Sequence, residues 1–317
     1  MTPNQDLQKD MPVTDTAMAL DGLAPFLKES KPAIQNTSLP TAINRALMTD
    51  ISFAREIAEA AGVNLAEHAG IVNEARTDAA RGTLFGASYC MLDGRYRSMD
   101  EALAKLAPEG VLELAAGHSP RGIATAGTYS LYVETDLADL VAQKREIVEA
   151  LKPDRDPSQH IIRPLNALHG SDLIAAGALF EEKNISNIAL THEGLFFYLT
   201  RDEQKVMRDN VAAFLKQFSP NGAWVSPDFV YDARLDEETT VMRATYERSA
   251  GRPWTTFSTD DEIREFMRDG GLKVEFLGND HLVGMLESAR RSGATNPDHV
   301  SRWLRECRVA VVRLVGP

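Results

Sequence analysis

Short apolar runs alternate with longer amphipathic segments through most of this chain, beginning near residue 111. Apolar runs bounded by glycine, proline or polar residues predict β-strands, and apolar positions spaced three and four apart predict helices. The expected strands cover residues 111–115, 130–135, 160–165, 185–192, 222–230, 272–278 and 308–315. The expected helices cover residues 120–127, 137–151, 171–182, 202–217 and 260–269. This alternation predicts an α/β fold with a seven-stranded, mostly parallel sheet whose last strand is antiparallel.

The beginning of the chain has a different pattern and predicts a helical cap, which divides the sequence into residues 1–75 and 76–317. A first helix with a proline in its first turn is expected to begin at Ser38, as its N-cap, and to end at Gly62; a second covers residues 65–75. About the first 20 residues are polar and are interpreted as a disordered tail. The cap helices either close over a ligand as a lid or pack without a role in the chemistry.

Two consecutive expected strands end in residues that suit a nucleotide ligand. The first is followed by Gly117, where the backbone can pass close to a ligand that a side chain would block. The second ends at Asp136, whose carboxylate can accept hydrogen bonds from both hydroxyls of a ribose. A glycine turn alone is equally typical of an ordinary strand-to-helix connection. The acidic strand end shifts the balance and favours an adenosine-bearing cofactor.

The residues around these strand ends resemble a known family. The E-x-A-x-G pattern at Glu113, Ala115 and Gly117 is similar to the first motif of class I S-adenosylmethionine-dependent methyltransferases, and it lacks the phosphate-binding glycines of NAD enzymes. Residues 132–137 and 192–199 resemble the leucine carboxyl methyltransferase family and its polyketide O-methyltransferase relatives. The resemblance implies a Rossmann-like methyltransferase sheet with an N-terminal helical cap, S-adenosylmethionine as cofactor, and O-methylation of a small acid or natural-product intermediate.

The resemblance also implies which residues bind the cofactor: Arg76, Glu113, Ala115, Gly117, Arg121, Asp136, Leu137, Asn166, Ala167, Glu193 and Gly194. In that assignment Arg76 pairs with the methionine carboxylate, Asp136 holds the ribose, and Glu193 faces the amino end of the cofactor. Asn166 stands where the family has an acidic residue beside the adenine, and an amide can still donate and accept there. Arg121 resembles a family arginine, with a structural ion pair at a helix start as the equal alternative.

Candidate substrate and catalytic residues are less sharply defined. Arg95 and Arg97, in a segment that precedes the core, either clamp a substrate carboxylate or form a solvated face, and Tyr89 lies in the same segment. His192 follows a strand next to a carboxylate and is the candidate base for a hydroxyl acceptor. Tyr198 either closes over the sulfonium by cation–π attraction or is a core residue. The sequence offers no decisive base, which favours an acceptor carboxylate that is already ionised.

Three further observations restrict the function. The 317 residues carry a net charge of −12, which disfavours nucleic acid and favours a small-molecule partner. The only cysteines, Cys90 and Cys307, and the seven histidines show no spacing of a disulfide framework or a metal site. The absence of a targeting or membrane-spanning pattern predicts a cytoplasmic protein.

A segment over residues 231–258 is expected either to form helices beside the pocket or to be a solvated excursion.

Two alternatives to methyl transfer share the same cofactor motifs. Some proteins similar to this family close S-adenosylmethionine on itself, and release methylthioadenosine together with azetidine-2-carboxylate. Such a cyclase would need no acceptor pocket, so the motifs do not separate it from a methyltransferase. A cofactor-binding protein without catalysis is the third possibility, and the intact Gly117 and Asp136 positions rank it last.

Overall fold

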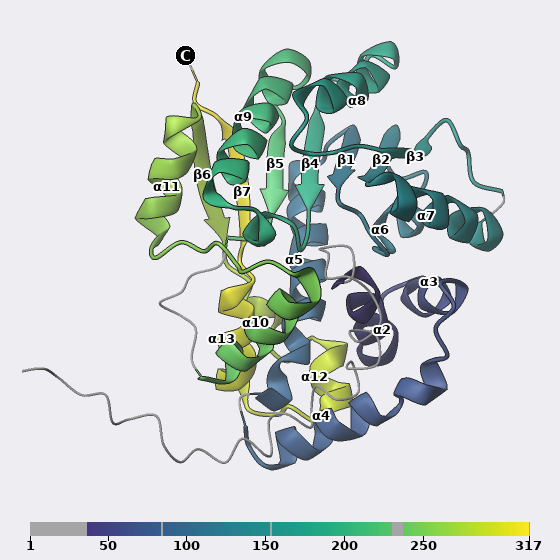
Figure 1. The fold of residues 1–317 in the computed structure, drawn as a ribbon, viewed down its shortest axis with the longest axis vertical. Coiled ribbons are helices and arrows are strands. Elements are labelled where there is room, and N and C mark those ends of the chain that lie inside the picture. The colour runs from purple at the N-terminus through teal and green to yellow at the C-terminus, as the bar shows by residue number, and fades with distance from the viewer. Residues whose placement is uncertain (1–36, 84, 153, 230–236, 317) are drawn as a thin grey trace, which may run out of the picture.

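A seven-stranded mixed sheet forms the centre of the protein (Figure 1). The computed structural model describes residues 37–83, 85–152, 154–229 and 237–316. The strands are β1 Gly110–Leu114, β2 Leu131–Asp136, β3 His160–Pro164, β4 Ile188–His192, β5 Ala223–Ser226, β6 Leu272–Leu277 and β7 Val309–Leu314. Their order is β3-β2-β1-β4-β5-β7-β6, with β1 to β5 parallel and β7 antiparallel to both its neighbours. The predicted fold class and the antiparallel last strand are confirmed.

Helices cover both faces of this sheet because alternate residues of each strand point to opposite sides. On one face, Leu112 and its counterparts pack against α8 Gly170–Glu182, α9 Arg201–Phe218 and α11 Asp260–Asp269. On the other face, Val111 and its counterparts pack against α5 Tyr89–Leu106, and α7 Ala138–Leu151 covers the end of the sheet at β3. α6, Arg121–Ala124, is a single turn after β1.

The cap differs in detail from the expected pair of helices. α2 covers Ser38–Met48 and α3 covers Ala54–Ala60, so the helix expected to run to Gly62 is interrupted. The interruption follows Thr49, which is extended and whose hydroxyl donates to the Arg45 carbonyl, a local bond that competes with the helical pattern. Ser38 is the first residue of α2, not its N-cap. The expected tail over the first 20 residues lies outside the described residues.

The second expected cap helix is also divided. It consists of a short 3₁₀ turn, η3 Leu65–His68, followed by α4 Gly70–Ala80. Figure 1 shows that α2 and α4 lie at the end of the sheet toward which β4 and β5 point. Helices from the end of the chain, α10 Glu237–Ala250, α12 Glu287–Ser292 and α13 Pro297–Glu306, lie at the same end. The helical layer over the strand ends is therefore built from both ends of the sequence, and the division at residue 75 remains a prediction.

Two segments adopt structures that the sequence did not indicate. The candidate substrate segment that contains Arg95 and Arg97 was expected as a loop or an exposed strand, but it is the first half of helix α5. β4 ends at His192, where the expected strand ends, but the rest of the family-like segment 192–199 forms a turn and a 3₁₀ helix, η5 Phe196–Tyr198. The other 3₁₀ turns of the described residues are η4 Phe85–Ala87 and η7 Asp280–Leu282. In the described part of the chain, no helix has the length and apolar character needed to span a membrane.

Candidate active site

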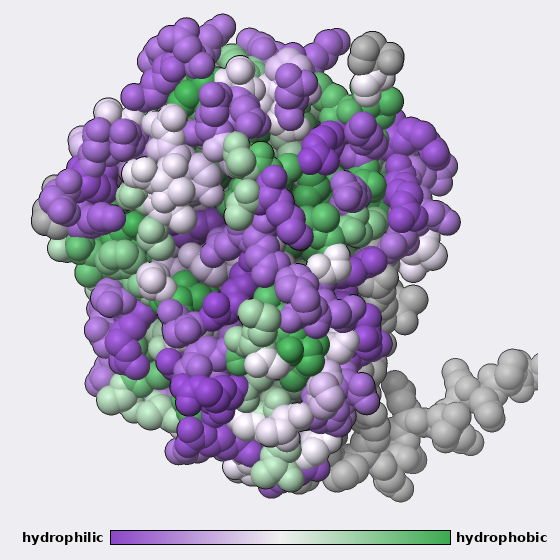
Figure 2. Space-filling model, turned by 180° about the vertical axis from the view of Figure 1, so that it is seen from behind, coloured by the Kyte–Doolittle hydropathy of each residue, from purple (hydrophilic) through white to green (hydrophobic). Residues whose placement is uncertain are grey.

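A cavity of about 450 Å³ lies between the carboxyl ends of the parallel strands and the helical layer. Residues that follow β1, β2, β3 and β4 form its floor, and residues of α2, α5 and α10 form the rest of its wall. The sheet order reverses between β1 and β4, which is where ligands bind in open α/β sheets. The volume falls in the range of about 300 to 1,000 Å³ that is typical of pockets for small molecules and cofactors. On the face shown in Figure 2, hydrophobic areas are broken up by hydrophilic residues, so the cavity is the stronger candidate site.

At one end of the cavity, the carboxylate of Asp136 is fixed by the backbone. Its Oδ2 accepts the N–H of Gly117 at 2.7 Å, and its Oδ1 accepts the N–H of Leu137 at 2.7 Å. Gly117 has φ +46°, and a β-carbon there would lie 2.7 Å from the Ser38 hydroxyl, so a larger residue would have to displace Ser38 of α2. Burial raises the pKa of Asp136 despite these two hydrogen bonds. Each oxygen keeps a lone pair with which it can accept a hydroxyl of a ligand.

Beside Asp136, the cavity has apolar walls and one amide. Leu137, Leu140 and Leu168 line this part, together with Asn166 and Ala167 from the loop after β3. The side-chain oxygen of Asn166 accepts the N–H of Leu168 at 3.0 Å, which orients the amide. A flat, partly polar ring system suits this environment, because apolar contact supplies the affinity and the amide supplies direction.

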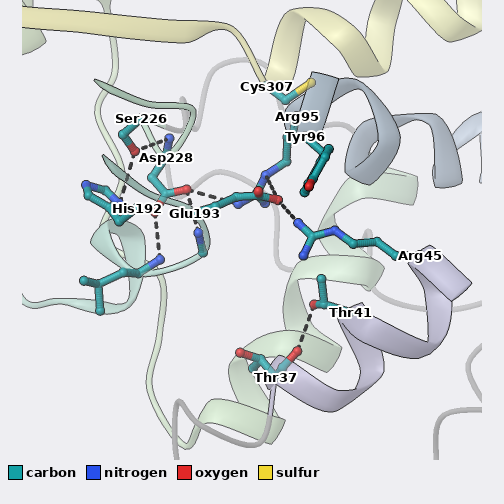
Figure 3. A network of polar contacts seen from close by, with 12 residues as sticks. Thr37, Thr41, Arg45, Arg95, Tyr96, His192, Glu193, Ser226, Asp228 and Cys307 are labelled. Carbon is teal, nitrogen blue, oxygen red and sulfur yellow. Dashed lines mark hydrogen bonds and ion pairs between the residues drawn. The ribbon is translucent and has the colours of Figure 1, made fainter. Parts of the chain in front are cut away.

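The other end of the cavity contains a carboxylate surrounded by three arginines, two of which, Arg45 and Arg95, are seen in Figure 3. Glu193, directly after β4, contacts Arg45 of α2, and lies 3.6 Å from Nε of Arg95 and 3.5 Å from Nη2 of Arg121. Burial alone would raise the pKa of Glu193, but the arginines hold it below its ordinary value. Among the described residues, the buried Nε atoms of Arg45 and Arg95 have no hydrogen-bond partner. Both side chains line the cavity, so a ligand carboxylate would satisfy them while Glu193 accepts an ammonium group.

Arg121 supports this end from behind and does not itself line the cavity. Its guanidinium is fully buried, with Nε 2.8 Å from Asp100 and Nη1 3.2 Å from Glu113, and it lies over the ring of Tyr96 at 4.2 Å. These contacts correspond to the structural ion pair at a helix start, the alternative to cofactor binding that the sequence left open for Arg121. Glu113 does line the cavity, and its other oxygen accepts the Tyr132 hydroxyl at 2.7 Å.

His192 is buried at the carboxyl end of the central strand β4 and does not line the cavity. Its Nδ1 lies 2.9 Å from Oδ2 of Asp228, and its ring packs between Phe196 and Trp224 with centroid distances of 6.0 Å and 5.6 Å. The side chain is therefore enclosed by protein on the sides where a substrate would have to approach. This geometry gives no support to a role for His192 as a general base.

The remaining predicted residues separate into those inside and those outside the cavity. Arg95 and Tyr198 line it. Arg97 lies outside, with its Nε 2.7 Å from Asp93. Tyr89 is buried among the hydrophobic residues of the cap. Arg76 is exposed on α4 and donates from Nε to the carbonyl of Arg291 at 2.9 Å. The predicted cofactor residues other than Arg76 and Arg121 all line the one cavity.

The cavity also has an aromatic wall. Phe197 packs against Tyr198 and Trp254 with centroid distances of 4.6 Å and 4.5 Å, and Tyr246 of α10 lies beside them. The expectation that residues 231–258 form helices beside the pocket is confirmed for their described part. This wall offers apolar contact next to the arginines, since the guanidinium of Arg95 lies 5.9 Å from the centre of the Phe197 ring.

Two residues of the site were not identified from the sequence. Arg45 lies between buried apolar residues of α2, and a charged residue within an apolar helix face is a usable sign of a buried partner. Asp228 lies just after β5, and Asp136 ends β2; an aspartate near the carboxyl end of a parallel strand is the sign that could have found it. In the described part of the chain, no group of His, Cys, Asp and Glu residues is arranged to hold a metal ion.

Comparisons with known proteins gave structural similarities only. No protein-family model and no curated protein sequence matches this chain. The magnesium protoporphyrin IX methyltransferase ChlM from Synechocystis PCC 6803 with bound SAH is 12% identical, with 71% of this chain and 85% of that chain covered and a TM-score of 0.42. The methyltransferase domain of bacterial CtHen1-C is 11% identical, with 71% and 100% covered and a TM-score of 0.44. LepI in complex with SAM is 10% identical, with 65% of this chain and 42% of that chain covered and a TM-score of 0.39.

Proposed function

We propose that this protein is an S-adenosylmethionine-dependent O-methyltransferase that acts on a carboxylate of a small, largely apolar molecule. One observation carries the proposal: a carboxylate suited to a ribose and a group suited to an amino acid lie in the same cavity. Asp136 is the last residue of β2 and Glu193 follows β4, with β1 between these strands, so the two backbones are about 10 Å apart at the usual strand spacing. A nucleoside that carries an amino-acid tail matches this arrangement.

The residues fit the cofactor in the following roles. Asp136 accepts the two ribose hydroxyls, and the loop with Asn166 and its apolar neighbours takes the adenine. Glu193 accepts the ammonium group. The unpartnered guanidinium nitrogens of Arg45 and Arg95 bind the carboxylate, the role that the family resemblance gives to Arg76. Arg76 is outside the cavity and has no role in the proposal.

When bound, S-adenosylmethionine supplies a methyl group on a positively charged sulfur. The chain's part is to hold the acceptor oxygen in line with that methyl group and to exclude water, which the enclosing helices and the aromatic wall favour. The rings of Phe197, Tyr198 and Trp254, which pack together in the cavity wall, would attract a positively charged sulfur that lay over one of their faces.

An ionised acceptor is favoured because the titratable residues of the cavity wall are poor bases. Burial lowers the pKa of His118 to about 4, and its Nδ1 is already bonded to the Ser38 hydroxyl. Glu193 is held by its arginines, and Glu113 by Arg121 and Tyr132. A carboxylate acceptor needs no proton removed, whereas an alcohol or phenol does.

The test is an incubation of the purified protein with S-adenosylmethionine, with and without a panel of aryl and alkyl carboxylic acids, followed by mass analysis. We expect S-adenosylhomocysteine and a methyl ester in equal amounts, and only when an acid is present. Asp136→Ala serves as the control variant and, at an S-adenosylmethionine concentration well below the Kd of the parent, should form both products roughly 10- to 100-fold more slowly. Methylthioadenosine released together with azetidine-2-carboxylate, without any acceptor, would replace the proposal with the cyclase. A protein that does not bind S-adenosylmethionine would contradict the cofactor assignment.

A further inference from the structure

Asp228 lies just beyond β5 and does not line the cavity, yet its buried carboxylate contacts five polar groups. Its Oδ1 accepts the N–H of Gly194 at 2.8 Å and Nη2 of Arg95 at 3.1 Å. Its Oδ2 accepts the N–H groups of the next two residues at 2.7 Å and 3.0 Å, and lies 2.9 Å from Nδ1 of His192. A carboxylate with this many partners fixes the position of each of them.

These contacts join two parts of the cavity wall, as Figure 3 shows. The first is the turn after β4, where Glu193 and Gly194 line the cavity and Gly194 has φ +83°. The second is the guanidinium of Arg95 on α5, whose Nη2 would lie 3.7 Å from a β-carbon at position 194. Asp228 holds both from the side away from the cavity. Without it, the turn and the arginine would have no common anchor among these residues.

The charge of Asp228 determines how the guanidinium of Arg95 divides its contacts between Asp228 and Glu193. Arg95 gives Nη2 to Asp228, and its Nε lies 3.6 Å from Glu193 without forming a hydrogen bond. A neutral side chain at position 228 would leave Glu193 as the one carboxylate close to Arg95 among the described residues, and the two would pair with each other. Burial opposes ionisation of Asp228, but His192 and Arg95 hold the pKa of its carboxyl well below the ordinary value.

We infer that Asp228 is a positioning residue for the amino-acid end of the cofactor: it keeps Arg95 free for the ligand carboxylate and the Glu193–Gly194 turn in place for the ammonium group. The hydroxyl of Ser226, which accepts the N–H of Asp228 at 3.1 Å, completes the support. This inference rests on the proposed function. It assigns no contact between Asp228 and the ligand.

The experiment compares two ligands by calorimetry. S-adenosylmethionine has the amino-acid end, and methylthioadenosine shares the adenosine part but lacks the amino and carboxyl groups. Asp228→Asn should weaken binding of S-adenosylmethionine about tenfold and change that of methylthioadenosine by less than about twofold. Asp93→Asn is the matched control, because Asp93 is also fully buried, and pairs with the neighbouring Arg97 outside the cavity. It should leave both affinities within about twofold of the parent, even if the melting temperature falls.

If Asp228 only stabilised the fold, Asp228→Asn would bind both ligands more weakly by the same factor, and that result would overturn the inference. Should Asp228→Asn not fold, Asp228→Glu takes its place, because it keeps the charge but displaces the turn. Asp228→Glu should lower the affinity for S-adenosylmethionine about threefold relative to that for methylthioadenosine. An unchanged ratio of the two affinities would also overturn the inference. If the parent protein binds neither ligand, the proposed function fails and not this inference.

Discussion

The two ends of the cavity are built in different ways. At the ribose end, one carboxylate is held by backbone N–H groups from the loops after β1 and β2, which are consecutive strands. At the amino-acid end, Glu193 is surrounded by arginines from α2, α5 and α6, and Asp228 from beyond β5 supports it. The first end depends on local chain geometry, and the second on side chains brought together by the whole fold.

This difference has an energetic consequence. Two N–H groups cost little to desolvate when they bond a carboxylate, so the ribose end can be precise without a large network. The amino-acid end removes several charges from water, and such networks add little to stability even when well paired. Changes at the ribose end should therefore affect all adenosine ligands alike, and changes at the other end should affect only ligands with an amino-acid tail.

The largest expected effect is that of Asp136→Ala. Loss of the charge-assisted hydrogen bonds to the ribose should weaken S-adenosylmethionine binding by about 1.5 to 3 kcal/mol, or roughly 10- to 100-fold. Methylthioadenosine should lose the same factor, because it carries the same ribose. Calorimetry with both ligands measures this. Asp139→Ala, an exposed carboxylate in the first turn of α7, is the control and should change neither affinity. A loss confined to S-adenosylmethionine would place Asp136 at the wrong end of the cavity.

A second prediction uses the opposite pKa shifts of the two ends. Burial raises the pKa of Asp136, whereas the arginines lower that of Glu193. As the pH falls from neutrality through the raised pKa of Asp136, both ligands should lose affinity together, by up to about tenfold per pH unit. Their ratio should stay constant, because Glu193 remains ionised in that window.

The sign of the accompanying stability change is also fixed. A carboxyl whose pKa is raised in the folded state stabilises the fold when it is protonated. The protonation of Asp136 that weakens ligand binding should therefore not lower the stability of the protein. Titration calorimetry over pH, with melting temperatures measured in parallel, checks both statements. Asp136→Asn should abolish the pH dependence. If the dependence persists in that variant, Glu113, whose pKa burial also raises, is the titrating group.

The contrast between the ends also explains what could be predicted from sequence. All seven strands form close to their predicted positions because each is a short apolar run between turn residues. Gly117, Asp136 and Asn166 line the cavity as expected, because each follows a strand whose neighbours in the sheet were themselves predictable. The ribose and adenine end is in this sense a local property of the chain.

The amino-acid end could not be predicted in the same way. Arg45 precedes β1 by many residues, and only the packing of α2 over the strand ends brings it to Glu193. Asp228 acts from behind the cavity wall, through hydrogen bonds to a turn after β4 that the hydrophobic pattern does not indicate. The candidate arginines of α5 were separated by helix geometry, because Arg95 and Arg97 point to different sides of one helix.

The smallest expected effect concerns Arg76, which the family resemblance assigns to the methionine carboxylate. Its side chain is exposed and donates to a carbonyl of α12, so Arg76→Lys should change the affinity for S-adenosylmethionine by less than about twofold. Arg45→Lys keeps the charge but loses the planar fork, and should weaken S-adenosylmethionine about fivefold without affecting methylthioadenosine. Calorimetry on the two lysine variants side by side decides between the assignments. If Arg76→Lys lowered the affinity for S-adenosylmethionine alone and Arg45→Lys did not, the carboxylate would bind at Arg76, and the amino-acid end of the cavity would need another ligand.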